Sequence, residues 1–391
     1  MATTHMNVCS IAGIGATEFS KASGRSELTL AIQAALAACA DAGLPPSAID
    51  GVVRADFDYV AHNDIVQALG LPNITYWGVS GPGGIAPSGL IGQAVAAIMS
   101  GQATTVLAFR SLNGRSGTRY GAPDVGASVG GHNTYEEFYS PYGLLSAAQM
   151  HALMARRHSI EFGTTAEDLG AIAVACRNRA NANPAAQMHS KPMTMESYLA
   201  APMISDPLRM FDCCLETDGA AAVIVTSTER ARDLRQPPAM IRAVAQSSGP
   251  NVQGGNMFPV LMRESITTMP GKVVADTLYQ RADVTPDDID VAQLYDCFTI
   301  TLLLELEDFG FCKKGEGGPF ASSGAIELDG SLPINTAGGH LSEGYIHGMN
   351  HVLEGVRQVR GESTNQVADT RLCLVTSAPP PASGAFILER A

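Results

Sequence analysis

The sequence predicts an α/β protein made of two similar halves. Helix-like and strand-like stretches alternate along most of the chain, which is typical of sheets covered by helices. One passage occurs twice, around residue 46 and again around residue 286. The composition, with 46% apolar and 16% charged residues over 391 positions, allows a large buried core and argues against disorder. We therefore expect two related α/β units that pack together.

The repeated passage reads AGLPPSAID at residues 42–50 and ADVTPDDID at residues 282–290. Proline and acidic residues suit a turn followed by a short helical start. In both copies a helix-like stretch precedes the passage and a strand-like stretch follows it. The four flanking stretches are residues 27–41, 51–57, 271–281 and 291–298.

A looser correspondence places a helix before a strand later in each half. The expected helices are residues 89–101 and 344–361, and the expected strands are residues 104–109 and 371–377. An apolar strand over residues 220–225 closes the first half, and the boundary is expected near residues 227–238. We therefore predict one half over residues 1–235, with a loop insertion at about 111–200, and a second half over residues 236–391. A pseudo-twofold axis between them would bring equivalent loops into one site.

Charge and cysteine usage exclude several classes of protein. The net charge of −13 argues against general binding of nucleic acid. No apolar run reaches about 18 residues, so we expect no membrane span, and the first residues lack the pattern of a secretory signal. Eight scattered cysteines form no CxxC pair, which fits free thiols in a cytoplasmic protein and indicates no zinc ribbon in this chain.

Several sequence blocks carry a family resemblance. They are residues 11–19 (IAGIGATEF), 83–89 (GGIAPSG), 158–165 (HSIEFGTT), 203–209 with 218–222, 293–299 (QLYDCFT) and 332–344 (LPINTAGGHLSEG). In this order the chain resembles the lipid-transfer, or sterol-carrier-protein, branch of the thiolase superfamily from Ile11 to Leu388. The resemblance implies a thiolase fold, with two βαβαβαββ halves in a five-layer αβαβα stack. It also implies a homodimer that binds acyl-coenzyme A thioesters.

The nucleophile of that family is missing. Its cysteine lies in a Gly-Gly-x-Cys-x-Ser-Gly turn, and here the same turn carries Ala86. A methyl group cannot attack a carbonyl, whereas acyl transfer needs an activated thiolate. The loop that holds the family's second cysteine corresponds to residues 377–384, SAPPPASG, which also lack sulfur. Cys373 lies upstream in an apolar strand and is interpreted as a structural thiol.

Two tyrosines stand where the family carries other polar groups. Tyr345, in the run GYIHG, replaces the histidine of a Gly-His-Pro-x-Gly motif. Tyr295 lies in a loop that often carries histidine or asparagine in the family. By the duplication, both should face the turn at Ala86. The alternative interpretation is that both phenols are core residues with a satisfied hydroxyl group.

Cleavage of a β-hydroxyacyl thioester needs no nucleophile. A base takes the proton of the β-hydroxyl, the carbon–carbon bond breaks, and a thioester enolate leaves. The chain is most similar to the cysteine-less steroid side-chain-cleaving aldolases. This resemblance implies that Tyr295 and Tyr345 are an acid/base pair, which releases a ketone and a short acyl-CoA. It also implies a partner protein with an OB fold and often a zinc ribbon.

Other residues are expected to support this pair. His347 follows Tyr345 by two positions and could orient it or a water molecule, although a structural role is an equal alternative. Ala86, Gly339, His340 and Gly344 are expected to line the oxyanion and substrate pocket, and a structural histidine is the competing interpretation for His340. We expect no metal and no cofactor, since coenzyme A is part of the substrate.

Three other functions remain open from the sequence. The chain could bind acyl-CoA or lipid without catalysis, or it could be a scaffold for another enzyme. It could also be an atypical thiolase that uses another thiol, such as Cys297. The residues that bind the coenzyme A phosphates are open as well. The candidates are Arg157, Arg177, Arg179 and Lys191.

Overall fold

The structure is a computed structural model that describes residues 6–56, 59–81, 83–117, 119, 139–250, 261, 263–377 and 382–391. These residues form one large sheet with the strand order β3-β2-β4-β7-β1-β8-β11-β10-β9 and a separate β5-β6 hairpin. The strands of the large sheet are β1 (Cys9–Ala16), β2 (Gly51–Ala55), β3 (Tyr76–Ser80), β4 (Thr105–Asn113), β7 (Asp218–Ser227), β8 (Ala239–Ser247), β9 (Val291–Gln293), β10 (Leu372–Ser377) and β11 (Ser383–Arg390).

The sheet consists of two equivalent sets of strands. Read outward from the centre, the first set runs β1-β7-β4-β2-β3 and the second runs β8-β11-β10-β9. Among the described residues, two strand pairs join the sets, Ser10 with Met240 and Ile11 with Ala239. β7 and β11 run antiparallel to both of their neighbours, while β2 and β9 run parallel to β4 and β10. The internal repeat therefore appears within this sheet as two sets of strands in which β1-β7-β4-β2 matches β8-β11-β10-β9, while β3 has no counterpart among the described strands.

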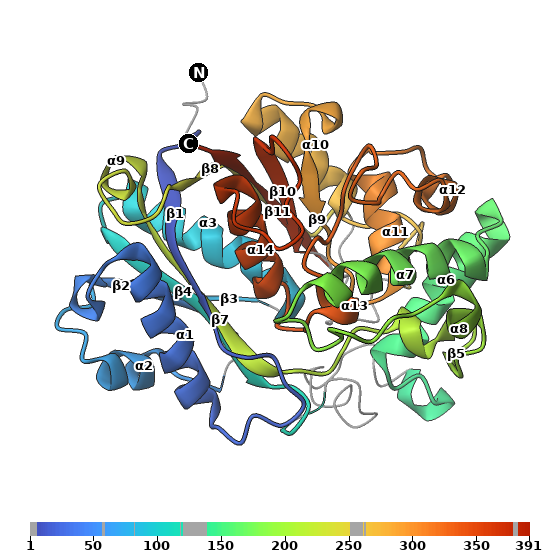
Figure 1. Ribbon diagram of the computed structural model, residues 1–391, viewed down its shortest axis with the longest axis horizontal. Helices are drawn as coiled ribbons and strands as arrows, with labels where there is room; N and C mark the ends of the chain where they lie inside the picture. Colours follow the sequence, from blue (N-terminus) through green and yellow to red (C-terminus); the bar gives the residue numbers. More distant parts are fainter. Residues whose placement is uncertain are drawn as a thin grey trace.

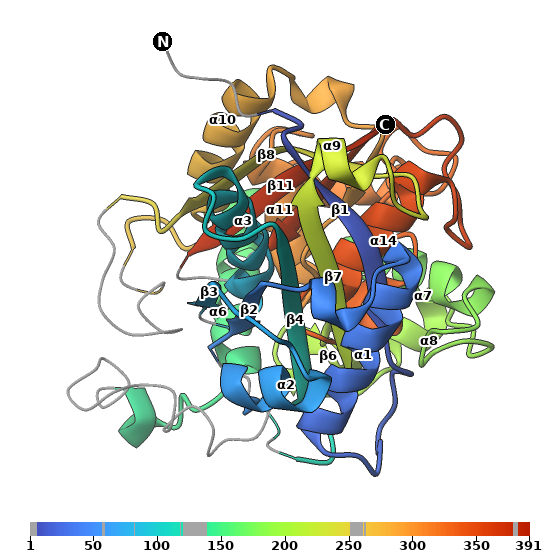
Figure 2. The ribbon, with the colours of Figure 1, turned by 90° about the vertical axis from the view of Figure 1, so that its left-hand side faces the viewer.

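Helices cover both sets and also lie between them. Helix α1 (Glu27–Ala42) packs on β1, β4 and β7, and α10 (Gly271–Ala282) packs on β8 and β11. Between the sets lie α3 (Ala86–Met99) and α14 (Met349–Arg360), and each contacts strands of both halves. Figure 1 shows these two helices in the middle of the molecule, and Figure 2 shows α1 and α2 (His62–Leu69) covering the strands of the first half. This is the predicted α/β architecture with five αβαβα layers.

The two copies of the repeated passage form the same local structure. Each helix, α1 or α10, leads through a short 3₁₀ turn into a strand, β2 or β9. Ser26 caps the start of α1 by accepting a hydrogen bond from the backbone of Thr29, and Gly43 ends the helix at φ 73°. Helix α3 begins at Ala86, three residues before the expected start.

A strand was expected over residues 291–298, but β9 ends at Gln293, so the prediction is wrong for residues 294–298. The side chain of Asn335 accepts a hydrogen bond from the backbone N–H of Leu294 and donates one to its carbonyl oxygen, at 2.7 and 2.9 Å. These bonds replace a strand partner, and the chain leaves the sheet there. Residues 294–298 instead form a loop that leads into α11 (Thr299–Asp308). The side chain of Tyr295 belongs to this loop.

The insertion expected at about residues 111–200 lies in the stretch between β4 and β7, and its bounds stay a prediction. Residue 118 and residues 120–138 of this stretch lie outside the described part. The rest contains α6 (Ala147–Phe162), α7 (Ala166–Ala182), α8 (Met195–Leu199) and the hairpin of β5 (Met203–Ser205) and β6 (Leu208–Arg209). His158 on α6 contacts Glu307 on α11 at 3.1 Å, which joins the insertion to the second half.

Three short helices complete the described elements: α9 (Thr228–Ala231), α12 (Gly317–Ser322) and α13 (Gly339–Ser342). Within the described residues, none of the helices combines the length and the apolar character that a membrane crossing requires.

Candidate active site

Two phenols from the second half meet at the centre of the candidate site. The hydroxyl oxygens of Tyr295 and Tyr345 lie 2.9 Å apart, which is a hydrogen bond. Their rings stand edge to face with centroids 6.4 Å apart. Tyr295 is fully buried, while Tyr345 is partly exposed. The structure thus brings together the two side chains that the sequence singled out 50 positions apart.

The loop of Tyr295 is held by buried polar groups. Its backbone N–H donates to a carboxylate oxygen of Glu305 at 2.9 Å and to the hydroxyl of Thr376 at 2.8 Å. Thr376 itself donates to Glu305 at 2.6 Å. Burial raises the pKa of Glu305 well above its ordinary value. This network fixes the backbone from which the Tyr295 ring projects.

The loop of Tyr345 is anchored to the first half. The backbone N–H of Tyr345 donates to the hydroxyl of Thr217 at 2.8 Å. Two residues later, His347 adopts a left-handed φ of 48°, and its Nδ1 lies 2.8 Å from Nη2 of Arg110 on β4. The His347 ring stands edge-on to the Tyr345 ring at 4.8 Å. The loop geometry therefore depends on a buried arginine from the other half.

The turn that carries Ala86 lies against one of these phenols, Tyr295. A β-carbon added to Gly84 would lie 2.1 Å from the Tyr295 hydroxyl, and one added to Gly348 would lie 3.0 Å from Pro87 and 3.3 Å from the Tyr295 ring. Ala86 is buried at the first residue of α3. The turn therefore meets the phenol through the bare backbone of Gly84.

A histidine pair lies behind the phenols. The His340 ring stands edge-on to Tyr295 at 4.5 Å and to Tyr345 at 5.0 Å. Asp296 accepts hydrogen bonds from the backbone N–H groups of His340 and Leu341, at 2.8 and 3.2 Å, and contacts Nε2 of His351 at 3.0 Å. Nδ1 of His340 lies 3.1 Å from a carboxylate oxygen of Asp296. Asp296 thereby fixes this loop next to the phenols.

The two glycines expected in the pocket lie where the backbone passes very close to another residue. Gly339 has a φ of 62°, and an added β-carbon would lie 2.2 Å from a carboxylate oxygen of Asp296. At Gly344 the added carbon would lie 2.7 Å from the ring of Phe19. Both positions therefore exclude a side chain, Gly339 beside the carboxylate and Gly344 against an aromatic ring of the first half.

Burial determines the protonation of the site. It raises the pKa of Tyr295, and the neighbouring Tyr345 raises it further. Burial and the neighbouring thiols raise the pKa of Tyr345, whereas the hydrogen bond from Tyr295 and the charge of Arg110 lower it. Burial also lowers the pKa of His340 and His347 well below the ordinary value. Both phenols and both imidazoles are therefore neutral at pH 7 in the ligand-free chain.

Comparison with known proteins identifies the family to which this fold belongs. Residues 256–388 match the family model described as thiolase C-terminal domain-like. A steroid side-chain-cleaving aldolase of Thermomonospora curvata is 44% identical over 97% of both chains. The 17-hydroxy-3-oxo-4-pregnene-20-carboxyl-CoA lyase of Mycobacterium tuberculosis is 42% identical over 97% of this chain and 98% of its own. This chain belongs to the thiolase superfamily, in its branch of sterol-carrier-protein-type aldolases.

Solved structures agree with this family. The Ltp2-ChsH2(DUF35) aldolase superposes with a TM-score of 0.93 at 42% identity, over 99% of both chains. A monomeric SCP2-thiolase-like protein of Mycobacterium smegmatis has a TM-score of 0.74 at 20% identity, over the whole of this chain and 78% of its own. The more distant structure supports the fold alone. The predicted family and fold are thus confirmed.

Among the described residues, one group of side chains has the spacing of a metal site. It consists of Asp296, His340 and His351, all of them buried. Both carboxylate oxygens of Asp296 already accept hydrogen bonds from the backbone or from His351. The group therefore has a structural explanation in the loop that it holds. The expectation that the chain needs no metal or cofactor stays a prediction.

Cys297 adjoins the site but lies in a poor environment for a nucleophile. Its sulfur is buried, 3.5 Å from the hydroxyl of Thr301 and 3.9 Å from Nε2 of His151. Burial raises the pKa of the Cys297 thiol far above its ordinary value. Reactive cysteines need a lowered pKa, so this geometry argues against Cys297 as an acyl carrier.

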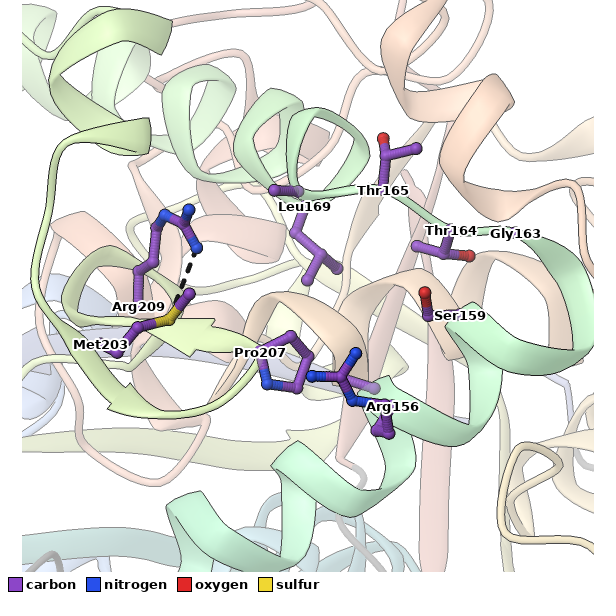
Figure 3. Close-up of a pocket in the computed structure, with 11 residues that line it drawn as sticks. Arg156, Ser159, Gly163, Thr164, Thr165, Leu169, Met203, Pro207 and Arg209 are labelled. Atoms are coloured by element: carbon purple, nitrogen blue, oxygen red, sulfur yellow. Dashed lines mark hydrogen bonds between the residues drawn. The ribbon is translucent and has the colours of Figure 1, made fainter.

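A separate cavity of about 430 Å³ lies in the insertion, between α6, α7 and the β5-β6 hairpin (Figure 3). Arg156, Thr164, Met203 and Arg209 are among its lining residues. None of the predicted site residues belongs to it. In Figure 3, Arg209 points toward the sulfur of Met203, and an interaction of 3.5 Å joins them.

Two of the four candidates for binding the coenzyme A phosphates, Arg177 and Arg179, are wrong because both are buried. Arg179 is fully buried and pairs with Glu327, and Arg177 is buried and donates to the hydroxyl of Ser342 at 3.0 Å. Neither offers its charge to a ligand from solvent. Arg157 and Lys191 are exposed and stay candidates.

Sequence reasoning missed three residues that shape the site: Arg110, Glu305 and Asn335. The first two had a visible signal, because each is a charged residue next to a run of apolar ones, residues 106–109 and 302–304. Charged groups are seldom fully buried unless they are paired. Asn335 had no such signal.

Proposed function

We propose that this chain cleaves a β-hydroxyacyl-coenzyme A thioester by a retro-aldol reaction, with a steroid as the acyl group. The names of the two relatives that are 44% and 42% identical support a steroid acyl group and a thioester substrate. One is a steroid side-chain-cleaving aldolase, and the other is a pregnene-carboxyl-CoA lyase. The products would be a ketone and a short acyl-CoA. One observation carries the proposal. The hydroxyl oxygens of Tyr295 and Tyr345 lie 2.9 Å apart, next to a turn that has no thiol.

The proton steps need only the two phenols. One phenol, in its ionised form, takes the proton of the β-hydroxyl. The oxygen's electrons form the new carbonyl, the carbon–carbon bond breaks, and its electron pair enters the thioester enolate. The second phenol then donates a proton to the α-carbon. Since the two hydroxyls are hydrogen-bonded, a proton can pass between them and restore the starting state.

The thioester oxygen needs a donor as it gains negative charge. His340 suits this role, because its ring stands edge-on to both phenols and is neutral, so that it carries one N–H group. Gly339 holds the backbone of His340 against Asp296. Ala86 would leave room for the acyl carbons where the family's nucleophile would otherwise stand.

We also propose the partners that the sequence predicted. The similar Ltp2-ChsH2(DUF35) aldolase is named as an assembly of two proteins, which supports a partner for this chain. From the family resemblance, we expect an OB-fold protein with a zinc ribbon. No cofactor enters the proposed steps, because coenzyme A arrives as part of the substrate.

A homodimer through β3 is part of the same proposal. Among the described residues β3 pairs only with β2, so its other edge carries backbone groups without a sheet partner in that part of the chain. Trp77 and Val79 on this strand are 56% and 37% exposed. Open edge strands with apolar side chains favour pairing with another chain, and closed twofold dimers are the commonest oligomers.

The decisive experiment combines the chain and its expected partner with a panel of β-hydroxyacyl-CoA compounds. Mass spectrometry would measure release of the ketone. Tyr295→Phe and Tyr345→Phe should each lower the rate by about 10²–10⁴-fold, because each removes a general acid or base. Tyr279→Phe is the matched control, since Tyr279 is a buried phenol bonded to the carbonyl oxygen of Phe309.

The outcomes separate the alternatives. Near-normal turnover in both site variants would refute the acid/base pair. Binding of the thioesters without any ketone release, with the partner present, would favour an acyl-CoA-binding or scaffold protein.

A further inference from the structure

The cavity in the insertion is separate from the two phenols. It has a volume of about 430 Å³ and lies between the end of α6, the start of α7 and the β5-β6 hairpin (Figure 3). Pockets that take small molecules usually measure about 300–1,000 Å³ and are mostly apolar, with a few polar groups. The apolar lining residues of this cavity are Ala155, Ala166, Leu169, Met203 and Pro207. Both its size and its lining therefore suit a small organic ligand.

The charged residues that line the cavity have one sign. Arg156 and Arg209 contribute to the lining, and no described aspartate or glutamate does. This is opposite to the net charge of the chain, which is −13. The start of α7 adds nothing to the attraction, because the backbone N–H and the hydroxyl of Thr165 already donate to the carboxylate of Asp168, both at 2.9 Å. An anionic ligand would therefore be drawn by the two arginines.

Arg209 is held in place but forms no ion pair with a described carboxylate. Its backbone N–H donates to Asp212 at 2.6 Å, and its Nε donates to the carbonyl oxygen of Leu199 at 3.2 Å. Nη1 lies 3.5 Å from the sulfur of Met203, which is a weak acceptor. Since a guanidinium has five N–H donors, the donors on Nη1 and Nη2 lack a strong acceptor among the described residues. This end of Arg209 can therefore receive an anionic group.

Arg156 is a weaker source of positive charge. It pairs with Asp206, and the two side chains are 47% and 66% exposed. Ion pairs at such exposed positions stabilise a protein little, because water competes for both partners. Asp206 cancels part of the charge of Arg156, so Arg209 is the principal contact for an anion.

The apolar wall of the cavity adjoins Arg209. Leu169 is 3% exposed, and Figure 3 shows its side chain between Arg209 and Ser159. Met203 is 49% exposed, and its thioether contacts the guanidinium. Methionine side chains adapt to differently shaped neighbours. A ligand that contacts both the wall and the guanidinium must combine an apolar body with an anionic group.

We propose that this cavity is a second binding site, which takes a small amphiphilic carboxylate. The two carboxylate oxygens accept hydrogen bonds from Nη1 and Nη2 of Arg209, because a planar guanidinium matches a carboxylate in a paired arrangement. The hydrocarbon chain lies along Leu169, Met203 and Pro207. The site uses none of the residues that act in the proposed retro-aldol reaction, so it goes beyond that function and does not depend on it.

Isothermal titration calorimetry on the full chain tests the site with three probes. Octanoate carries the charge and the chain, octan-1-ol carries the chain alone, and acetate carries the charge alone. Octanoate should bind at one site with a Kd below about 1 mM, which a ligand of its size can reach. Octan-1-ol and acetate should each bind about tenfold more weakly or worse, because each lacks one of the two contacts.

Arg209→Met should weaken octanoate binding by about tenfold or more, because it removes hydrogen bonds to a charged group, and should leave octan-1-ol binding within about twofold. Arg157→Met is the matched control, since Arg157 is an exposed arginine on α6 that pairs with Glu161 and lies outside the lining. It should leave octanoate binding unchanged. Asp206→Asn removes the carboxylate that competes for Arg156 and should strengthen octanoate binding by up to about fivefold.

A filled cavity provides a test that keeps both arginines. Ser159 lies on the wall of the cavity and is half-buried, so Ser159→Leu adds volume there without removing a core residue. This variant should weaken octanoate and octan-1-ol alike, because the added side chain occupies the space of the hydrocarbon chain. If Arg209→Met does not fold, Ser159→Leu and Asp206→Asn still test the site.

Three results would overturn the inference. The first is an octanoate Kd that stays the same in both Arg209→Met and Ser159→Leu, which would move the ligand to another part of the protein. The second is the absence of saturable octanoate binding up to about 1 mM. The third is acetate binding as tight as that of octanoate, which would exclude the apolar contact. Each of these results leaves the aldolase proposal standing, because ketone release is measured separately.

Discussion

Gly84 approaches the hydroxyl of Tyr295 so closely that an added β-carbon would lie 2.1 Å from the phenol oxygen. No such contact is tolerated in proteins, so either the turn or the ring must move if a side chain is present. The turn belongs to the first half and the phenol to the second. The relative placement of the halves is thus fixed at the site itself.

Gly84→Ala should therefore displace the Tyr295 hydroxyl and lower kcat/KM for ketone release by about 10²-fold, since a shift of about 1 Å can have that effect. Turnover assays and thermal denaturation would measure activity and stability together. Gly92→Ala on α3 is the control, because its β-carbon would meet only Val244, at 3.5 Å. Alanine is favoured over glycine in a helix by about 1 kcal/mol, so the control should be active and at least as stable. Unchanged turnover in Gly84→Ala would mean that the Tyr295 hydroxyl has no catalytic position to lose.

Cys297→Ala should keep ketone release within about threefold of the parent chain, because the proposed steps need no thiol. The buried thiol fills space, so the variant should lose some stability, about 1–2 kcal/mol by analogy with other core truncations. Denaturant unfolding and the ketone assay would test both statements. Cys373→Ala, a buried thiol on β10, provides a matched control. If only Cys297→Ala abolished turnover, an atypical thiolase mechanism would regain support.

Features that depend on neighbouring residues could be predicted from the sequence, whereas contacts between distant residues could not. The repeated passage and the alternation of elements predicted the α/β class, and the motif positions identified Tyr295 and Tyr345. Their 2.9 Å contact was only expected in outline, because it depends on how the two loops are held. The division of the halves at residue 235 and the catalytic roles stay predictions.

Other features were not visible because their causes lie far away in the chain. Arg110 acts on a residue 237 positions later, and no spacing rule connects them. β9 is short because Asn335, 41 positions from Leu294, takes over its backbone groups. Such pairings between distant residues arise from tertiary packing, within one half or between the two, which a single sequence does not reveal.

The stability of the chain should depend on the pH through Glu343. Burial raises the pKa of this carboxyl from 4.5 to about 8, and Asn350 donates to it at 3.0 Å. Between these values the unfolded chain has lost the proton and the folded chain keeps it. The folded state therefore binds more protons, and the free energy of unfolding falls as the pH rises through this window, by about 1.4 kcal/mol per unit from this group.

Glu343→Gln should remove that contribution. Its free energy of unfolding, compared with the parent chain, should be similar near pH 5 and higher near pH 8. Denaturant unfolding at several pH values would measure the difference. Glu362→Gln is the control at an exposed glutamate and should leave the slope unchanged. The prediction fails if the parent and Glu343→Gln show the same slope between pH 5 and 8.

Val79→Lys should weaken the proposed dimer at β3. Val79 is 37% exposed on β3, which pairs with β2 alone among the described strands, and a lysine there would place two charges near the twofold axis of a strand-to-strand contact. Light scattering coupled to gel filtration should therefore give the mass of two chains for the parent and a lower mass for the variant. Leu328→Lys introduces the same charge at a residue that is 40% exposed in the second half, so it controls for the added lysine. A parent chain that is monomeric at all concentrations would rule out the dimer. A dimer that persists in Val79→Lys but dissociates in Leu328→Lys would move the contact from the β3 edge to the second half.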